Sequence, residues 1–249
     1  MVNLKSAVVS CADAVLAVVL APACAACAQV LERPAAGPVC RECWGAVKAV
    51  RPPLCATCGD PLASWRVLTI EEGVCARCRR LEPAFDSARA AGEYEGALRG
   101  IIHAFKYDGR RSLAGPLAAM MRDAGADLLR DADCVVPVPL HPWRRLQRGF
   151  NQAADLAQLL RRPVVRGLWR ARATVPQSGL RPAQRRRNVR AAFMLSPLAD
   201  VRGRRIALVD DVRTTGATLD ACARVLKEAG ARTVTALTAA SVSNRRTTW

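Results

Sequence analysis

Histidine is scarce in this sequence: only His103 and His141 occur among its 249 residues. Because histidine is the side chain that most often moves protons near neutral pH, we do not expect histidine acid–base chemistry, and we expect both residues to be structural. Charge-free apolar runs long enough to cross a membrane are also lacking, since such a helix needs about 20 residues. The sequence therefore predicts a soluble protein.

Acidic residues are nearly missing from residues 141–190, which hold thirteen arginines and one acid, Asp155. The whole chain carries a formal net charge of +17, of which residues 1–90 contribute +2 and residues 91–249 contribute +15. Charge clustered in this way favours partners that bear phosphate, either small molecules or nucleic acid. Global disorder is not expected, because 51% of the residues are apolar and can build a core.

Cysteine, in contrast, is abundant, and eight of the eleven cysteines form four Cys-x-x-Cys pairs. The pairs are Cys24 and Cys27, Cys40 and Cys43, Cys55 and Cys58, and Cys75 and Cys78. Two thiolates at this spacing hold one side of a tetrahedral zinc ion, so the pattern predicts two structural Zn²⁺ sites in the reducing cytoplasm. Sequential pairing gives one site from the first two pairs and one from the last two; a cross-braced pairing and a disulfide-rich secreted module are the alternatives. The isolated Cys11, Cys134 and Cys222 are expected in the core.

The chain divides into three predicted parts: an N-terminal helix over residues 1–22, a double zinc ribbon over residues 23–82 and a larger domain over residues 90–245. The first part loosely imitates a secretion signal. Asp13 interrupts its apolar run and Pro22 disrupts the cleavage pattern, so we expect a short amphipathic helix that packs on the body, with secretion as the alternative. The ribbon part has little periodicity and would need metal to fold.

From residue 94 onward, short buried strands alternate with helical segments. Strands are expected at residues 134–138, 206–209 and 233–239, and helices from Asn151 to Arg161 and over residues 217–229. This alternation predicts an α/β fold with a mostly parallel sheet flanked by helices. Ligands of such sheets bind at the carboxyl ends of the strands.

The segment Ile206–Leu219 carries the strongest functional signal. Its four apolar residues are followed by Asp210 and Asp211, and then by a small, hydroxyl-rich loop with Gly216 that opens a helix. Backbone N–H groups at such a helix start receive a phosphate, and paired carboxylates accept hydrogen bonds from sugar hydroxyls. The pattern predicts a sugar-phosphate site; an ordinary strand, turn and helix, with Asp and Thr as turn and cap residues, is the alternative.

A second predicted strand end lies at Pro137–Leu140. The loop after it holds three arginines, a glycine and the expected helix start: Arg144, Arg145, Arg148, Gly149 and Asn151. Guanidinium groups and backbone N–H donors in that place would surround a second anionic group. A solvated basic loop is the alternative.

Together these motifs resemble the ComF family of phosphoribosyltransferase-like proteins. The resemblance runs through the four cysteine pairs, Phe105-Lys106-Tyr107, Pro137–Leu140, RGFNQ at 148–152, Arg172–Phe193 and VDDVRTTGAT at 209–218. It implies a type I phosphoribosyltransferase-like fold, with a mostly parallel sheet flanked by helices and a small N-terminal zinc-ribbon module. It also implies that the protein binds phosphoribosyl pyrophosphate (PRPP), with Mg²⁺ bridging the ligand oxygens.

The resemblance gives roles to three sets of residues. Asp210 and Asp211 would reach the ribose hydroxyls. The 5′-phosphate would be wrapped by Thr214, Thr215, Gly216, Ala217 and Thr218. Pyrophosphate would face the loop with Pro139, Leu140, Gly149 and Asn151, and its departing charge would be stabilised by Arg148, Arg185 and Arg187. Residues 172–190 would form a flap over the site, and Lys106 either faces the site or extends from a helix end into solvent.

Three functions are compatible with these features. The first is a PRPP-binding protein linked to the uptake of single-stranded DNA in natural transformation, alongside a helicase, as the resemblance implies; the intact acid pair and loop favour catalysis. The second is a phosphoribosyltransferase of nucleotide metabolism that acts on a nucleobase. The third is a catalytically silent nucleic-acid-binding factor, for which the arginines, with Trp143, Phe150 and Trp169, offer phosphate contacts and stacking surfaces.

Overall fold

The computed structural model describes residues 21–62, 73–170 and 192–242. Several sequence-based expectations lie outside these residues. They are the N-terminal helix, apart from its last two positions, Cys11, Arg185 and Arg187, and the flap over residues 172–190.

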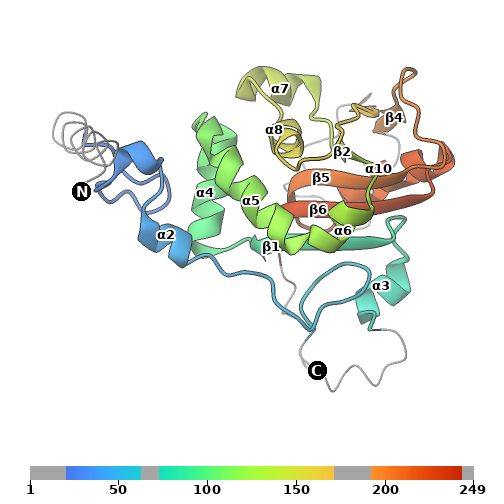
Figure 1. Cartoon of the computed structure of the whole chain (residues 1–249), viewed down its shortest axis with the longest axis horizontal. Coiled ribbons are helices and arrows are strands. Elements are labelled where there is room, and N and C mark those ends of the chain that lie inside the picture. Colours follow the sequence, from blue (N-terminus) through green and yellow to red (C-terminus); the bar gives the residue numbers. More distant parts are fainter. Residues whose placement is uncertain (1–20, 63–72, 171–191, 243–249) are drawn as a thin grey trace, which may run out of the picture.

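A four-stranded sheet in the order β1-β6-β5-β2 forms the centre of the larger domain (Figure 1). The strands are β1 (Ser87–Glu93), β2 (Cys134–Pro137), β5 (Arg205–Arg213) and β6 (Thr233–Ser241). All three pairings are parallel, and β5 and β6 pair from Arg205 with Thr233 to Arg213 with Ser241. The predicted parallel sheet is confirmed.

Apolar residues of β5 pack on both faces of the sheet. Ala207 and Val209 belong to one buried cluster, and Ile206 and Leu208 to the other, because successive side chains of a strand point to opposite faces. A strand buried on both faces has a continuous apolar sequence, which is why this segment lacks the alternation of a half-exposed strand.

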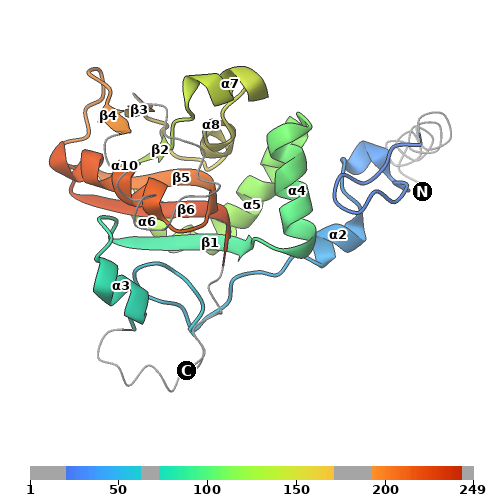
Figure 2. The ribbon, with the colours of Figure 1, turned by 180° about the vertical axis from the view of Figure 1, so that it is seen from behind.

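Helices cover both faces (Figures 1 and 2). The helical elements of the larger domain are α4 (Gly96–Tyr107), η3 (Arg111–Leu113), α5 (Ala114–Ala124), α6 (Ala126–Asp131), α7 (Pro142–Arg148), α8 (Gln152–Gln158) and α10 (Ala217–Glu228). Buried side chains of α4, α5 and α8 pack on one face, and those of α10 pack on the other. The larger domain is therefore a three-layered α/β fold.

A small antiparallel pair lies on the α10 side of the sheet. It consists of β3 (Leu168–Arg170) and β4 (Phe193–Leu195), with Leu168 paired to Leu195. Leu168 and Phe193 are buried in the same cluster as Cys222 of α10.

The two cysteine-rich segments lie apart from each other (Figures 1 and 2). Their helices are η1 (Pro34–Ala36) and α2 (Arg41–Gly45) in the first, and α3 (Ala76–Leu81) in the second. The first packs on α4, where a Cβ on Gly100 would lie 3.1 Å from Ala26 Cα. The second packs under β1, where Gly59 takes φ +69° and a Cβ would lie 2.2 Å from the Ala88 carbonyl oxygen. Only glycine fits that approach.

The segment between the two cysteine-rich parts runs beside the outer edge of β1. Val50 donates its N–H to the Ala91 carbonyl at 3.3 Å, and the Lys48 carbonyl accepts from the Glu93 N–H at 2.8 Å. An isolated antiparallel bridge joins Ala49 to Gly92. The edge strand is therefore hydrogen-bonded on its open side over part of its length.

Some element boundaries differ from the sequence-based expectation. The helix that begins after Asn151 ends at Gln158 rather than Arg161, because Arg161 adopts φ +57° where the chain turns to bring Val164 beside Val135 of β2. The strand expected at residues 206–209 continues to Arg213, because β6 provides hydrogen-bonding partners along its whole length. The acid pair thus lies within β5.

Candidate active site and metal centres

Two carboxylates, Asp210 and Asp211, lie in the second half of β5. Asp211 is 8% exposed, and its Oδ1 lies 2.7 Å from Lys106 Nζ of α4. Asp210 Oδ1 accepts the Asp211 N–H at 2.9 Å, and its charged neighbours include Arg170 of β3. Since α4 and β3 pack in clusters on opposite faces of the sheet, the carboxylates point to opposite sides of one strand end.

The pKa of Asp210 is strongly perturbed. Burial of the carboxyl group, followed by the charge of Asp211, raises this pKa from 3.8 to about 7, although Lys106 and Arg170 oppose the rise. Near neutral pH the protonated and ionised forms of Asp210 are therefore both populated. Carboxyl groups with such shifts are concentrated in functional sites.

The loop after β5 forms a small cradle at the start of α10. Gly216 takes φ +77° and is the N-cap of this 12-residue helix, without a side chain that could cap it. The first N–H groups of a helix lack intrahelical partners, so they point outward as donors at its positive end. A pocket of about 20 Å³ lies here, lined by residues that include Asp210, Thr214, Thr215, Gly216, Ala217 and Thr218. All five residues predicted to wrap a phosphate thus lie around one pocket.

The loop after β2 is organised by Asn151. Its Nδ2 donates to the Val138 carbonyl at 3.1 Å, and its Oδ1 accepts the Ala153 N–H at 3.1 Å. Asn151 therefore joins the end of β2 to the start of α8, as its predicted helix-capping role requires. Pro139 and Leu140 lie half-buried between that strand end and α7.

Gly149 and His141 define the two ends of α7. Gly149 ends the helix with φ +74°. His141 caps its start, because the His141 Nδ1 accepts the Trp143 N–H at 3.3 Å, in agreement with the structural role expected for this histidine. His103 is exposed, and the centroid of its ring lies 4.7 Å from that of Tyr107.

The Phe105-Lys106-Tyr107 triplet at the end of α4 connects three parts of the site. Phe105 is buried against Phe150, with ring centroids 5.6 Å apart, and Lys106 pairs with Asp211. Tyr107 accepts a hydrogen bond from Arg148 at 3.0 Å, and the guanidinium lies 4.7 Å from its ring centroid. The Lys106 side chain is only 14% exposed, so the solvent-directed alternative for this lysine is wrong.

Two of the three aromatic residues expected to stack on bases are exposed, Trp143 by 62% and Trp169 by 50%. Phe150, the third, is only 7% exposed, so the expectation that it offers a stacking surface is wrong. It packs in the core beside Phe105, because burial of an aromatic ring against another is favourable. Cys134 and Cys222 are fully buried, as predicted.

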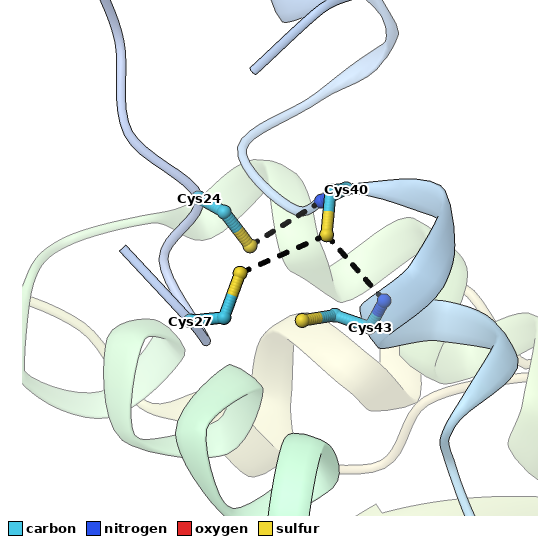
Figure 3. Close-up of side chains that lie close together, drawn as sticks. All are labelled: Cys24, Cys27, Cys40 and Cys43. Carbon is cyan, nitrogen blue, oxygen red and sulfur yellow. Dashed lines mark hydrogen bonds between the residues drawn. The ribbon is translucent and has the colours of Figure 1, made fainter. Parts of the chain in front are cut away.

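The cysteine pairs form two separate clusters. Cys24, Cys27, Cys40 and Cys43 make the first (Figure 3), and Cys55, Cys58, Cys75 and Cys78 make the second. Within each cluster all sulfur atoms lie within 4.8 Å of one another. The pairing is sequential, so the cross-braced alternative is wrong, and none of the ten described cysteines forms a disulfide bond. Four converging sulfur ligands are the donor set of structural zinc.

The electrostatics of both clusters favour a bound cation. Although burial opposes it, the backbone N–H groups of Cys40 and Ala26 lower the pKa of Cys24 to about 6. In the second cluster, hydrogen bonding from Cys58 lowers the pKa of Cys55, and that of Cys58 is raised by the same contact. One thiolate is thus stabilised in each cluster, while the pKa values of Cys40 and Cys43 in the first and of Cys58 and Cys78 in the second are raised. A bound divalent metal removes this conflict, because it stabilises all the thiolates that bind it.

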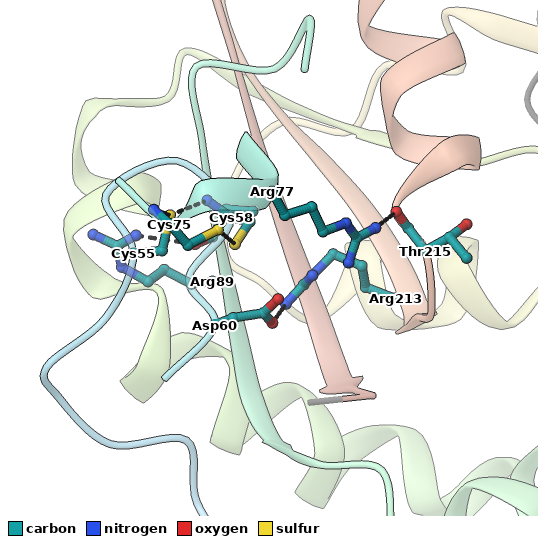
Figure 4. A network of polar contacts seen from close by, with 9 residues as sticks. Cys55, Cys58, Asp60, Cys75, Arg77, Arg89, Arg213 and Thr215 are labelled. Atoms are coloured by element: carbon teal, nitrogen blue, oxygen red, sulfur yellow. Dashed lines mark hydrogen bonds and ion pairs between the residues drawn. The ribbon is translucent and has the colours of Figure 1, made fainter. Parts of the chain in front are cut away.

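Sequence reasoning missed the residues that join the second cluster to the phosphate cradle. Arg213 of β5 pairs with Asp60, and Arg77 of α3 donates to the Thr215 carbonyl (Figure 4). Arg213 and Asp60 are 153 residues apart, so no local pattern indicates the pair. The sequence likewise gives no signal that Tyr107 accepts a hydrogen bond from Arg148.

The parallel sheet, the acid pair and the two cysteine clusters define the class of this protein: a phosphoribosyltransferase-like fold with a double zinc ribbon. Two family models match the chain accordingly. A double zinc ribbon domain covers residues 15–79, and a phosphoribosyl transferase domain covers residues 146–249.

Curated relatives match most of the chain. Competence protein F of Haemophilus influenzae is 34% identical over 77% of this chain and 85% of its own length. DNA utilization protein YhgH of Escherichia coli is 32% identical over 79% and 87%, and competence protein ComFC of Bacillus subtilis is 28% identical over 77% and 79%. The chain belongs to the ComF family of competence proteins.

Among solved structures, the chain matches an orotate phosphoribosyltransferase from Aeropyrum pernix. That protein is 18% identical, with a TM-score of 0.34, and the match covers 54% of this chain and 75% of that one. Among the described residues, no helix is both long enough and apolar enough to cross a membrane.

Proposed function

We propose that this protein binds PRPP with Mg²⁺ at the carboxyl ends of β2 and β5 and transfers its phosphoribosyl group, in the handling of single-stranded DNA during uptake. The junction of β5 and α10 carries the proposal, because two carboxylates and an uncapped helix start lie together there. A cytoplasmic location and a helicase partner belong to the proposal. The link to DNA uptake on which both rest is supported by the words competence and DNA utilization in the names of relatives.

The cradle at Gly216 supplies the contacts for the 5′-phosphate. The backbone N–H of Thr218 donates to its oxygens, and the dipole of the 12-residue α10 favours its charge. The left-handed conformation of Gly216 lets the backbone pass close to the ligand without a side chain in between.

The acid pair orients the ribose. Asp211 accepts a hydrogen bond from one ribose hydroxyl while Lys106, 2.7 Å away, fixes the carboxylate in position. Asp210 reaches the neighbouring hydroxyl from the other side of the strand end. Its raised pKa lets it act as a hydrogen-bond donor or acceptor near neutral pH.

Displacement of pyrophosphate requires orientation and charge stabilisation rather than a covalent nucleophile. As the bond from C1 of the ribose to pyrophosphate breaks, positive charge builds on the sugar ring and negative charge on the departing group. Arg148 is positioned to meet that negative charge, because Tyr107 and Gln152 hold its guanidinium at 3.0 and 3.1 Å. A bound Mg²⁺ supplies further charge to the oxygens of PRPP.

A second candidate function is nucleic-acid binding without catalysis. The observation in its favour is the basic helix α7 beside the candidate site, with exposed Trp143 and exposed Arg144 and Arg145. Bases stack on exposed indoles, and guanidinium groups contact the backbone phosphates. Both activities can coexist, because this surface and the PRPP cradle use different residues.

Calorimetric titration with PRPP and Mg²⁺ tests the first proposal. We expect saturable binding that Asp211→Asn weakens about tenfold or more, since the hydrogen-bonded charge is lost. Asp133→Asn is the matched control, because that carboxylate also pairs with a cation, at 2.9 Å from Arg205, but lies at the other end of the sheet. Absence of PRPP binding by the wild-type protein would overturn the proposal.

Pyrophosphate release in the presence of nucleobases and single-stranded DNA tests catalysis. Release that depends on one acceptor supports transfer and identifies the acceptor class. Binding of PRPP without release for any acceptor contradicts the transferase proposal.

Fluorescence anisotropy with a short single-stranded oligonucleotide tests the second candidate. We expect affinity to fall by orders of magnitude between about 50 mM and about 200 mM salt if several phosphates are contacted. Trp143→Ala is expected to weaken binding about fivefold or more through lost stacking. Leu146→Ala, on the same helix and 83% exposed, is the matched control. Equal affinities for both variants, or salt-independent binding, would contradict this function.

A further inference from the structure

The second cysteine cluster is joined to the phosphate cradle by two arginines (Figure 4). Arg77 lies between the two ligands of the Cys75–Cys78 knuckle and donates to the carbonyl of Thr215. Arg213, the last residue of β5, pairs with Asp60, which follows the Cys55–Cys58 knuckle. Each knuckle of the cluster therefore makes one polar contact with the loop or with the strand that leads into it.

The Arg213–Asp60 pair is almost completely removed from solvent. The side chains are 2% and 13% exposed, so neither charge can be hydrated if the other is lost. A buried charge without its partner is strongly destabilising, and the segment that carries it must then move. The position of Asp60 thus determines where the end of β5 can lie.

Both knuckles are fixed relative to the body of the protein. Gly59 brings the first knuckle into contact with the Ala88 backbone of β1, where no larger residue fits. The Cys55 sulfur accepts the N–H groups of Cys58 at 3.5 Å and of Cys75 at 3.3 Å, one from each knuckle. The metal site is therefore the point at which the two anchors of the loop are held together.

The arginine side chains bridge a gap rather than lie in a close-packed interface. A cavity of about 70 Å³ separates α3 from the loop, and its lining includes Arg77, Phe85, Arg213, Thr215 and Gly216. Because apolar packing between α3 and the loop is incomplete, the arginine side chains that span the gap provide the contacts that couple the position of the loop to that of α3. The first cluster packs elsewhere, on α4 beside Gly100.

We propose that the second zinc ribbon holds the phosphate loop in its binding conformation, so that metal at the Cys55, Cys58, Cys75 and Cys78 site controls phosphate binding at residues 214–218. Arg77 and Asp60 are the positioning residues, and neither is a metal ligand. Zinc fixes the two knuckles relative to each other, and the arginines transmit that geometry to the loop. The part of this inference that concerns phosphate rests on the proposed function; the part that concerns the loop does not.

Amide hydrogen exchange of the zinc-loaded full-length protein tests the loop coupling without any ligand. We expect Arg77→Gln to speed exchange at residues 214–218 about tenfold, the effect of losing one charge-assisted hydrogen bond. Arg80→Gln, an exposed arginine on the same helix, is the matched control and leaves exchange unchanged. Asp60→Asn acts in the same direction as Arg77→Gln, with Asp133→Asn as its control.

Metal content is measured on every variant, so that an effect on the loop is separated from loss of zinc. With two zinc ions retained, faster loop exchange in Arg77→Gln and Asp60→Asn supports the proposal. Unchanged exchange in both overturns it.

Cysteine variants test the role of the metal itself. Cys78→Ser removes a ligand of the second cluster and Cys43→Ser one of the first. We expect loop exchange to accelerate only in Cys78→Ser, and equal acceleration in both would overturn the assignment to the second ribbon. If Cys78→Ser does not fold, the exchange rates of Arg77→Gln still test the coupling between ribbon and loop, because this variant keeps all eight cysteine ligands.

Titration with PRPP and Mg²⁺ provides the second measurement. We expect the wild-type protein to bind PRPP and the Arg77→Gln variant to bind it about tenfold more weakly. This result would support control of the cradle by the second ribbon. Wild-type affinity in the variant overturns that control. A wild-type protein that binds no PRPP refutes the proposed function, while the exchange measurements still decide the loop coupling.

Discussion

Replacing Asp210 with asparagine should stabilise the ligand-free protein at neutral and alkaline pH. Folding raises the pKa of this carboxyl from 3.8 to about 7. The folded state therefore binds the proton more tightly than the unfolded state, so its stability falls as pH rises through this interval. Each pKa unit corresponds to about 1.4 kcal/mol, so the full shift amounts to about 4 kcal/mol above pH 7.

The expected gain is about 2 to 4 kcal/mol, because some solvent reaches the Asp210 side chain and weakens the effect. Asparagine cannot ionise and has nearly the same shape, so Asp210→Asn removes the pH-dependent cost. Urea unfolding of both proteins, with zinc content checked at each pH, measures the difference. It should grow by about 1.4 kcal/mol per pH unit between about pH 5 and about pH 7 and reach its full value by about pH 8.

Asp133→Asn is the control for this experiment. The pKa of Asp133 is lowered by its hydrogen bond with Arg205, so this group stays ionised in folded and unfolded protein throughout that pH range. Its variant should differ from wild type by a constant amount. The reasoning fails if Asp210→Asn also shows a constant difference, or if it loses stability as pH rises. The same variant should bind PRPP more weakly, so stability and ligand binding would change in opposite directions.

Three further changes have expected outcomes. Lys106→Met leaves the buried Asp211 carboxylate without its cation and should lower the free energy of unfolding by about 3 kcal/mol in urea titrations; a loss under about 1 kcal/mol would contradict the ion pair. Gly59→Ala places a methyl group against the Ala88 carbonyl at φ +69°, so the second cluster should separate from β1 and its thiols should react faster with a labelling reagent, while Gly45→Ala, which has open space, should not change the rate. Chelation should release two zinc ions per chain in a colorimetric assay, and release of fewer would mean that one cluster holds no metal.

The local parts of the site could be predicted from the sequence because the chemistry is contiguous there. Asp210, Asp211 and Gly216 lie within seven residues, so strand, carboxylates and helix start are visible in one segment. The cysteine pairs have fixed spacing for a physical reason, and their sequential grouping follows the order of the chain.

Contacts between distant segments could not be predicted in the same way. Asp60 and Arg213 are each ordinary charged residues in sequence, and they meet because the second cysteine-rich segment packs on β1 through Gly59. For Lys106, helix periodicity places the side chain at a helix end, but the direction of that end is set by the packing of α4 on the sheet. Phe150 shows the same limit, because its inward orientation depends on Phe105.

The segment that joins the two ribbons has a consequence for self-association. The backbone of residues 48–50 occupies hydrogen-bonding groups on the outer side of β1, which would otherwise be an open sheet edge. Unpaired strand edges invite strands of other molecules, and covering them is a common protection against aggregation. The zinc ribbons anchor this covering segment at both ends. Loss of metal should therefore expose the unpaired N–H and C=O groups of this edge strand. A protein depleted of zinc should then be prone to oligomerise through β1.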